Sequence, residues 1–249
     1  MSDERIDQHI VFRRSWWPAL DPRRAAVLVV DMQEYQVRPE WPYHQFRNKF
    51  SPGLRDYFMQ RVAEVAEPNI VRIVRAAREA EVPVVLTKFC SHDNQGRDLP
   101  RHIRYLNDVA AEVMGKPAFP SQDDPAAAMV PSLTPGEGDI VITKTTCSVF
   151  TSSDLERALK NMGVEHLVIC GVLTNACVES SARAGADLGF YVSVVDDACA
   201  AWSESAHAAS LRAFEMCFGA VTKTDSVVGQ LQRSWLRAAD VGRPLGLGR

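Results

Sequence analysis

Short apolar runs alternate with amphipathic segments along most of the chain. The apolar runs place hydrophobic side chains at consecutive positions, which is typical of strands buried on both faces of a parallel sheet. We predict such strands over residues 25–30, 83–87, 139–143, 166–170, 190–195 and 220–223. Other segments have apolar residues at helical spacing. We predict helices over residues 68–80, 152–161, 176–188, 204–217 and 226–239.

The alternation of strands and helices predicts an α/β fold. Parallel strands that are joined by right-handed helical crossovers form a sheet with helices on both faces. We therefore expect a three-layer, doubly wound, mostly parallel sheet of about six strands. A single domain is expected over residues 25–239. Residues 240–249 contain Gly and Pro and are predicted as a flexible tail.

Three further segments show no clear period. Residues 1–24 are predicted as an N-terminal arm that carries Trp16 and Trp17. Two adjacent exposed tryptophans are unfavourable, so we expect this arm to pack on the core or on a neighbouring subunit. Residues 32–66 and 88–138 are predicted as irregular. Loops as long as the second one are usually functional, so we expect it to cover the active edge of the sheet and shape the pocket.

Composition and charge narrow the possible partners. The chain has 249 residues, of which 46% are hydrophobic, enough for one sizeable domain. A net charge of -3 indicates no general affinity for nucleic acid. No apolar run approaches the roughly 18 residues of a membrane span. The six cysteines form no C-x-x-C pair and the N-terminus lacks a signal-peptide core, so we expect reduced thiols and a cytoplasmic protein.

Three polar side chains follow predicted strands at the edge where α/β proteins bind ligands. Asp31 ends the first strand, Lys144 ends the strand over 139–143, and Cys177 lies where the helix after residues 166–170 begins. Exposed N–H groups and the helix dipole at that position favour a thiolate, which is a strong nucleophile. Singly, each residue also has a structural interpretation, as a buried cysteine, a turn-forming Asp or a solvated Lys. Together they form a more specific constellation of a thiol, an acid and a cation.

These residues lie in motifs that resemble those of the isochorismatase-like cysteine hydrolases, from about Ala25 to about Val228. The matching segments are Val29-Val30-Asp31-Met32-Gln33, Lys144 with Ser148-Val149-Phe150, Gly171-Val172-Leu173-Thr174-Asn175-Ala176-Cys177-Val178-Glu179-Ser180, and Gly189-Phe190-Tyr191-Val192 followed by Val195-Asp196-Asp197-Ala198. The resemblance implies that Asp31, Lys144 and Cys177 form a catalytic triad. It also implies a cis peptide before Leu173 and an oxyanion hole made by the backbone N–H groups of Leu173 and Cys177.

The resemblance further implies a C–N hydrolase that acts on a small amide or ureido compound through a thioester and without a cofactor. Within the family, the chain most resembles the ureidoacrylate, N-carbamoylsarcosine and biuret hydrolases. The resemblance also implies a homodimer or homotetramer. No Asp-x-His pair is present, so we expect no metal and interpret His44, His92 and His102 as solvated loop residues. Alternatives are an isochorismatase-type vinyl-ether hydrolase, an inactive binding or assembly protein, and a redox sensor in which Cys147 or Cys170 lies near Cys177.

The substrate pocket is less defined by the sequence. Gln33 either reaches the substrate or orders its loop, and Asn175 either hydrogen-bonds near the nucleophile or caps the helix. Tyr35 and Phe150 either wall the pocket or belong to the core. His207 lies within a helix and is predicted to be structural. Candidates for binding a substrate carboxylate are the basic residues Arg38, Lys88, Arg97, Arg101 and Arg104.

Overall fold

The computed structural model describes residues 3–241, which form an α/β fold around one sheet. All neighbouring strands pair in parallel, in the order β3-β2-β1-β4-β5-β6. The strands are β1 (Ala25–Val30), β2 (Val84–Phe89), β3 (Ile140–Lys144), β4 (His166–Val172), β5 (Tyr191–Ala200) and β6 (Ala220–Thr222). The predicted α/β sheet is confirmed, and every predicted strand is present. The changes at the strand ends are small except in β5, which runs on to Ala200, well beyond its predicted end at 195.

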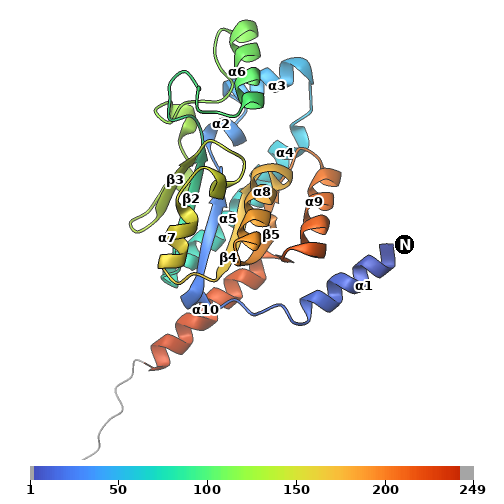
Figure 1. The fold of residues 1–249 in the computed structure, drawn as a ribbon, viewed down its shortest axis with the longest axis vertical. Coiled ribbons are helices and arrows are strands. Elements are labelled where there is room, and N and C mark those ends of the chain that lie inside the picture. Colours follow the sequence, from blue (N-terminus) through green and yellow to red (C-terminus); the bar gives the residue numbers. More distant parts are fainter. Residues whose placement is uncertain (1–2, 242–249) are drawn as a thin grey trace, which may run out of the picture.

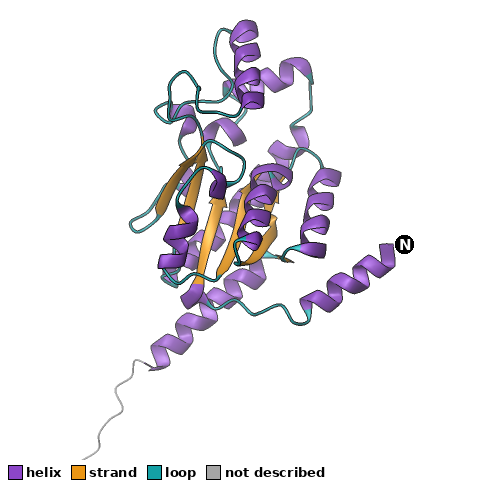
Figure 2. Ribbon diagram, viewed as in Figure 1, coloured by secondary structure: helices purple, strands orange, loops and turns teal. Residues whose placement is uncertain are grey.

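The strands at the centre of the sheet are the most apolar. Every residue of β1 and β4 is buried, as expected for strands that are covered on both faces. Figure 2 shows helices on both sides of the sheet, with α7, α8 and α9 on one face. Helices α5 and α10 pack against each other on the opposite face. The predicted apolar stripe of α5, which includes Ile70, Ile73, Val74 and Ala77, is buried there.

Ten α-helices are assigned in the described range. They are α1 (Asp3–Arg14), α2 (Glu34–Val37), α3 (Pro42–Phe50), α4 (Asp56–Arg61), α5 (Glu67–Glu79), α6 (Arg101–Met114), α7 (Leu155–Asn161), α8 (Glu179–Asp187), α9 (Glu204–Cys217) and α10 (Thr224–Val241). The last helix extends to Val241, beyond its predicted end at 239 and into the predicted tail. Residues 242–249 of that tail lie outside the described range.

The two segments predicted as irregular contain helices, which corrects that expectation. Residues 32–66 include α2, α3 and α4, and residues 88–138 include α6. The helix α6 buries only Ile103 and Ala110, so its apolar stripe is too narrow to stand out in the sequence. Figure 1 places α3 and α6 together at the end of the molecule beyond the carboxyl ends of the strands. This is the edge at which the candidate residues were expected.

The N-terminal arm is also helical, and it is held mainly by polar contacts. The Arg14 guanidinium forms a two-pronged ion pair with the Glu215 carboxylate of α9, and Arg13 donates to the carbonyl oxygen of Met216 at 2.5 Å. Trp17 packs edge-on against Tyr191, with ring centroids 5.8 Å apart. Trp16 does not share this burial, because 64% of its surface is exposed in the single chain. Trp17 therefore packs on the core. Trp16 does not, and its packing on a neighbouring subunit stays a prediction.

The closest backbone approach in the sheet lies between Gly171 of β4 and Val30 of β1, directly before Asp31. Gly171 has a φ of +116°, and a Cβ atom there would lie 2.1 Å from the carbonyl oxygen of Val30. We expect Gly171→Ala to reduce the free energy of unfolding by about 3 kcal/mol or more, because both backbone strain and overlap result. Urea unfolding measures this change.

Gly229→Ala is the matched control for that substitution. A Cβ atom at Gly229 in α10 meets only the Arg233 guanidinium, at 3.7 Å. This variant should gain about 0.5–1 kcal/mol from the higher helix propensity of alanine. Equal urea midpoints for the two variants would contradict the role assigned to Gly171.

Candidate active site

The structure brings Asp31, Lys144 and Cys177 together at the carboxyl edge of the sheet. Asp31 follows β1, Lys144 is the last residue of β3, and Cys177 lies in the π-helical turn Thr174–Val178 that leads from β4 into α8. The Nζ atom of Lys144 lies 2.7 Å from Oδ2 of Asp31, and both side chains are fully buried. The Lys144 ammonium also interacts with the Cys177 thiol. Three residues that are distant in sequence thus form one buried polar cluster.

Lys144 is held as a cation by its surroundings. Its ammonium group donates to the carbonyl oxygen of Thr146 at 3.0 Å and lies 4.3 Å from the centroid of the Phe89 ring. Burial by itself lowers the pKa of Lys144, but the Asp31 carboxylate and the Cys177 thiol outweigh it and raise that pKa above its ordinary value. Lys144 is therefore a fixed positive charge beside the thiol and the carboxylate at neutral pH.

Asp31 is oriented by a hydroxyl of the neighbouring strand. Thr87 of β2 donates to Oδ1 of Asp31 at 2.6 Å, and its oxygen accepts from the Asp31 backbone N–H at 3.2 Å. Asp31 has a φ of +53°, an uncommon left-handed conformation for a residue with a side chain and one that is concentrated at functional sites. Its Oδ2 atom accepts no aligned hydrogen bond within the described part of the chain. This leaves one carboxylate oxygen with capacity to accept a proton.

A second thiol lies beside Cys177. Cys147, in the loop after β3, interacts through its side chain with Cys177 and lies near the charge of Lys144. The hydrogen bond with Cys177 and the Lys144 charge lower the pKa of Cys147 to about 7. The same hydrogen bond, together with burial, raises the pKa of Cys177. The two thiols therefore compete for the stabilisation that Lys144 gives to a thiolate.

The turn that carries Cys177 is supported from α9. Thr174 Oγ1 lies 2.8 Å from Nδ1 of His207, whose Nε2 lies 2.9 Å from Oδ1 of Asp196. Ser210 donates to the carbonyl oxygen of Thr174 at 3.2 Å. The peptide bond between Val172 and Leu173 is cis. These contacts agree with the structural role expected for His207, which fixes the turn through Thr174.

Two of the predicted pocket residues serve the surrounding loops. The Gln33 side chain donates to the carbonyl oxygen of Ala127 at 3.0 Å and accepts from the Phe89 backbone N–H at 2.6 Å. The Tyr35 hydroxyl donates to the carbonyl oxygen of Phe89 at 2.7 Å. Both side chains are fully buried. These contacts favour the loop-ordering interpretation of Gln33 and the core interpretation of Tyr35.

The other two predicted pocket residues lie on the periphery. The Phe150 ring stacks on Phe190, with centroids 6.1 Å apart, and lies against Gly185 of α8. These contacts favour its interpretation as a packing residue. Asn175 is exposed within the turn, and the residue that begins this turn, Leu173, has no side-chain cap. Asn175 therefore lies beside the nucleophile candidate without capping the helix.

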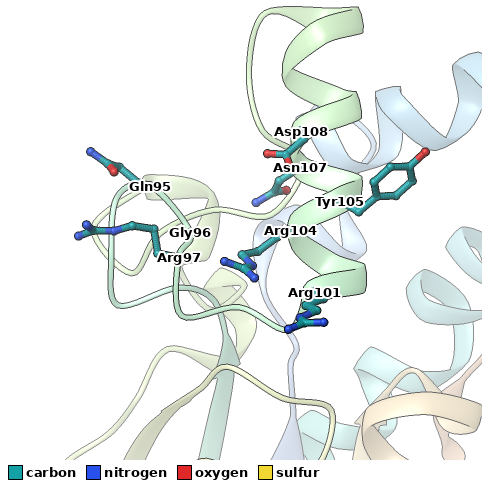
Figure 3. A pocket seen from close by; sticks show the side chains of 8 residues that line it. All are labelled: Gln95, Gly96, Arg97, Arg101, Arg104, Tyr105, Asn107 and Asp108. Atoms are coloured by element: carbon teal, nitrogen blue, oxygen red, sulfur yellow. The ribbon is translucent and has the colours of Figure 1, made fainter.

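The five basic candidates for binding a substrate carboxylate lie apart from the cluster. Arg38 is paired with Glu67 at 2.9 Å, and Lys88 is half-buried on β2. The remaining three line a surface cavity of about 430 Å³ together with Gln95, Gly96, Tyr105, Asn107 and Asp108. Figure 3 shows Arg101 and Arg104 on α6 and Arg97 on the loop opposite, where Arg97 is paired with Asp93 at 2.7 Å. The cavity lining includes none of Asp31, Lys144 or Cys177.

The three histidines expected in solvated loops lie in different places, and the expectation is wrong for two of them. His44 belongs to α3 and is half-buried, and His102 belongs to α6. Nδ1 of His92 lies 3.2 Å from Oε1 of Gln122. Among the side chains that the structure describes, residues 4–233, no three His, Cys, Asp or Glu are grouped closely enough to hold a metal ion. Between residues 3 and 241, no helix combines the length and the apolar character needed to cross a membrane.

Sequence reasoning did not identify Thr87 or Phe89 as part of the site. Thr87 is a polar residue within the otherwise apolar strand β2, and it lies beside β1 in the sheet. A hydroxyl in a buried strand that neighbours a predicted acid is a signal that could have found it. Phe89 gives no comparable signal. Its contact with the Lys144 ammonium depends on the pairing of β2 with β3, which places the two residues side by side.

Comparisons with known proteins identify the family and the fold of the chain. The model of the isochorismatase domain family matches residues 25–226. The chain is 31% identical over 226 residues to the ureidoacrylate amidohydrolase RutB of Serratia proteamaculans, covering 86% of this chain and 85% of the relative. It is 32% identical over 234 residues to the RutB of Pantoea ananatis, covering 88% and 87%. Among solved structures, a cysteine hydrolase from Pseudomonas syringae pv. phaseolicola superposes with a TM-score of 0.72 at 25% identity, over 87% of this chain and 96% of that one.

A more distant solved structure shares the fold. The N-carbamoylsarcosine amidase of Thermoplasma acidophilum superposes with a TM-score of 0.57 at 20% identity, over 81% of this chain and 97% of that one.

Removing the neighbouring thiol should make Cys177 ionise at lower pH. The hydrogen bond with Cys147 raises the pKa of Cys177, so Cys147→Ala should lower that pKa. The rate of Cys177 alkylation by iodoacetamide would then rise at a lower pH than in the unmodified protein, as measured by peptide mass spectrometry across a pH series. Cys217→Ala, which removes an exposed thiol, is the control and should leave the profile unchanged. A profile that moves to higher pH in Cys147→Ala would contradict the coupling.

Proposed function

The chain belongs to the isochorismatase family, and from that premise we propose that it is a cysteine-dependent amidohydrolase acting on a small ureido compound. The observation that supports this most directly is the buried cluster of Asp31, Lys144 and Cys177 at the carboxyl edge of the sheet. The named relatives that match most of the chain are ureidoacrylate amidohydrolases. A ureido substrate offers a carbonyl carbon to a thiolate and a nitrogen leaving group, which is the chemistry that this cluster suits.

In the proposed first step, Asp31 acts as the base. Its Oδ2 atom has no aligned hydrogen bond in the described chain and takes the proton from Cys177. The thiolate attacks the ureido carbonyl carbon and forms a C–S bond, while the carbonyl electron pair moves to oxygen. The backbone N–H groups of Leu173 and Cys177 donate to this oxyanion, and one such donor typically contributes about 10²–10³ in rate.

The proposed intermediate then collapses and is hydrolysed. The C–N bond breaks as the protonated Asp31 gives its proton to the leaving nitrogen, which departs as ammonia or an amine. The carbonyl carbon remains on Cys177 as a thioester. Asp31 next deprotonates a water molecule that attacks the thioester, the C–S bond breaks, and the proton returns to sulfur. Each step moves one proton between Asp31 and a reacting atom, so no external acid or base is required.

Lys144 has an electrostatic role in this scheme. Its charge stabilises the carboxylate of Asp31 and favours the thiolate of Cys177 over the thiol. It does not transfer a proton, because the same neighbours raise its own pKa. The Thr87 hydroxyl binds Oδ1 and restricts the rotation of the Asp31 carboxylate, while Oδ2 lies 2.7 Å from the Lys144 ammonium. The cluster is thus arranged before substrate binds, which is a general source of enzymatic rate enhancement.

Cys177→Ala should abolish ammonia release from ureidoacrylate, because the nucleophile is lost. Cys147→Ala should retain activity within roughly tenfold, since that thiol only modulates the pKa of Cys177. A coupled assay for ammonia measures both. A mass spectrum of the unmodified protein quenched in acid should show a substrate-derived adduct on Cys177. An adduct on Cys147, or near-normal turnover by Cys177→Ala, would refute the assignment of the nucleophile.

The same assay separates the other interpretations of this family site. A vinyl-ether hydrolase would release no ammonia from any ureido or amide compound and would cleave an isochorismate-like ether. A protein that only binds or assembles would do neither, and Cys177 would react with iodoacetamide no faster than the other thiols. The presence of all three of Asp31, Lys144 and Cys177 supports the hydrolytic interpretation over an inactive one.

We further propose that the protein is a homodimer or homotetramer in a reducing compartment such as the cytoplasm. All six cysteines are free thiols, which supports the reducing compartment. The rings of Phe12, on α1, and Trp16, just after it, pack together, yet 62% and 64% of these residues remain exposed in the single chain. A second copy of the chain that covers this pair would bury apolar surface now in contact with water.

Light scattering coupled to size-exclusion chromatography should give a mass of about two or four times the 27.6 kDa chain. The double substitution of Phe12 and Trp16 by serine should shift this mass toward that of the single chain. A single-chain mass for the unmodified protein would contradict the proposed assembly.

A further inference from the structure

Two arginines without an acidic partner lie together above the sheet edge. The guanidinium carbon of Arg55 is 4.9 Å from the centroid of the Tyr43 ring, and that of Arg47 is 5.3 Å from the same centroid. Arg55 is only 2% exposed, and its Nη2 group donates to the carbonyl oxygen of Gln36. In the part of the chain that the structure describes, neither arginine forms an ion pair with Asp or Glu. The molecule therefore holds two neighbouring positive charges, one of them buried, with no compensating carboxylate.

Unused hydrogen-bond donors are concentrated at this place. Buried polar side-chain atoms without a hydrogen-bond partner are few within residues 3–233, and all except Oδ2 of Asp31 belong to residues around Tyr43. They are Nε and Nη1 of Arg55, Nε of Arg47, Nε1 of Trp202, Nδ1 of His44 and Oε1 of Gln36. Most of these atoms are N–H donors. Buried donors are almost always satisfied in folded proteins, so such a group needs an explanation.

The uncompensated charge of Arg55 favours the binding of an anion. Burial, together with the charge of Arg47, lowers the pKa of Arg55 to about 10, so the group stays charged at neutral pH while its charge is disfavoured. A buried charge that lacks both a counter-ion and full hydrogen bonding is strongly unfavourable for folding. Such an arrangement persists at sites where function requires it. An anionic ligand with several acceptor oxygens would satisfy the unused donors and offset the charge.

The position of Trp202 connects this group to the proposed active site. Ala200 at the end of β5 is paired with Val172 at the end of β4, so Trp202 lies just beyond the strand end beside Leu173. The guanidinium carbon of Arg47 is 5.1 Å from the Trp202 ring. The unused donors therefore lie over the same sheet edge as the turn that carries Cys177.

A second path of contacts links the group to Lys144. The Tyr43 ring packs against Tyr35, with centroids 5.8 Å apart, and the Tyr35 hydroxyl donates to the carbonyl oxygen of Phe89. The Phe89 ring lies under the Lys144 ammonium. Tyr35 and Phe89 both pack against the ring of Phe119. The arginine group and the catalytic cluster are thus joined by one continuous aromatic wall, which consists of Tyr43, Tyr35, Phe119 and Phe89.

We propose that Arg47, Arg55 and Trp202 form a subsite that binds a carboxylate of the substrate, and we call these three residues the arginine subsite. This inference rests on the proposed function and adds to it the residues that bind the acid group of a ureido acid. Guanidinium groups bind carboxylates through paired N–H donors, and the rings of Tyr43 and Phe58, which both lie within 5 Å of the Arg55 guanidinium carbon, hold it in place. The acid binds at the arginine subsite while its ureido carbon faces Cys177.

The surface cavity of Figure 3 is a competing place for an anion, and it is less suitable. Arg97 there is already paired with Asp93, Asp108 adds a negative charge to the lining, and Arg101 and Arg104 are exposed to water. Exposed charges are screened by solvent, so they gain little from one bound carboxylate. Arg104→Gln consequently provides a matched control for substitutions in the arginine subsite.

The test compares ureidoacrylate with its methyl ester, which keeps the ureido group and removes the negative charge. For Arg47→Gln and for Arg55→Gln, we expect kcat/KM for the acid to fall roughly 10- to 100-fold, as for the loss of a charged hydrogen bond. Hydrolysis of the ester should change less than about threefold, and Arg104→Gln should leave both substrates unaffected. If Arg55→Gln does not fold, Arg47→Gln decides the outcome, because its side chain is only half-buried.

Three outcomes would overturn the arginine subsite. The first is an equal loss of kcat/KM on the acid and the ester in Arg47→Gln and Arg55→Gln, which would indicate a structural role. The second is no loss on either substrate in these variants. The third is a selective loss on the acid in Arg104→Gln alone.

A binding experiment separates this inference from the proposed function. Calorimetry of Cys177→Ala, which is not expected to turn over, should show binding of ureidoacrylate that is weakened at least tenfold when Arg47→Gln is added. If the unmodified enzyme hydrolyses no ureido compound but this dependence on Arg47 is present, the proposed function fails and the arginine subsite stands. If it hydrolyses the acid and the ester equally well and Arg47→Gln changes neither, the arginine subsite fails and the proposed function stands.

Discussion

The ion pair between Lys144 and Asp31 is the interaction on which the site depends. Both groups are fully buried, and removing such charges from water costs several kcal/mol each, so the attraction across 2.7 Å must be supported by further contacts. The Thr146 carbonyl and the Phe89 ring supply them on the lysine side, and the Thr87 hydroxyl supplies one on the carboxylate side. The pair joins the edges of β1 and β3 across β2, and it gives Cys177 a neighbouring cation and a neighbouring base at once.

The sheet holds this pair in place through close backbone packing. Gly171 lets β4 approach Val30 more closely than any side chain would permit, directly where β1 gives way to Asp31. The next residues of β4 lead into the turn of Cys177, which is tied to α9 through Thr174 and His207. The proposed nucleophile and base therefore follow adjacent, paired strands of one sheet.

The arginine subsite differs from the Lys144–Asp31 pair, because its charges are uncompensated. Lys144 has a carboxylate within contact distance, whereas Arg47 and Arg55 have none in the described chain. We infer that this arrangement lowers the stability of the fold and favours the binding of an anion. The same aromatic wall borders both places, so one substrate could contact both. An enzyme that uses a paired cation for chemistry and unpaired cations for recognition would distinguish charged ureido acids from neutral ureas, because a neutral ligand leaves the buried donors unsatisfied.

The sequence by itself determined the parallel sheet and the three residues at its edge. Consecutive apolar residues define β1 and β4, and parallel strands bring their carboxyl ends to one edge of the sheet. Asp31, Lys144 and Cys177 could therefore be expected at that edge without coordinates, and the resemblance to the cysteine hydrolases implied that they form a triad. Helix α6 was not predicted because its buried stripe is narrow. Arg47 and Arg55 were not predicted as site residues because arginines in polar segments are usually solvated. Their burial, and the contact of Cys147 with Cys177, depend on how segments distant in sequence pack over the sheet edge. Local patterns specify strands and their ends, but the environment of a side chain is set by tertiary neighbours, and only the folded chain decides those.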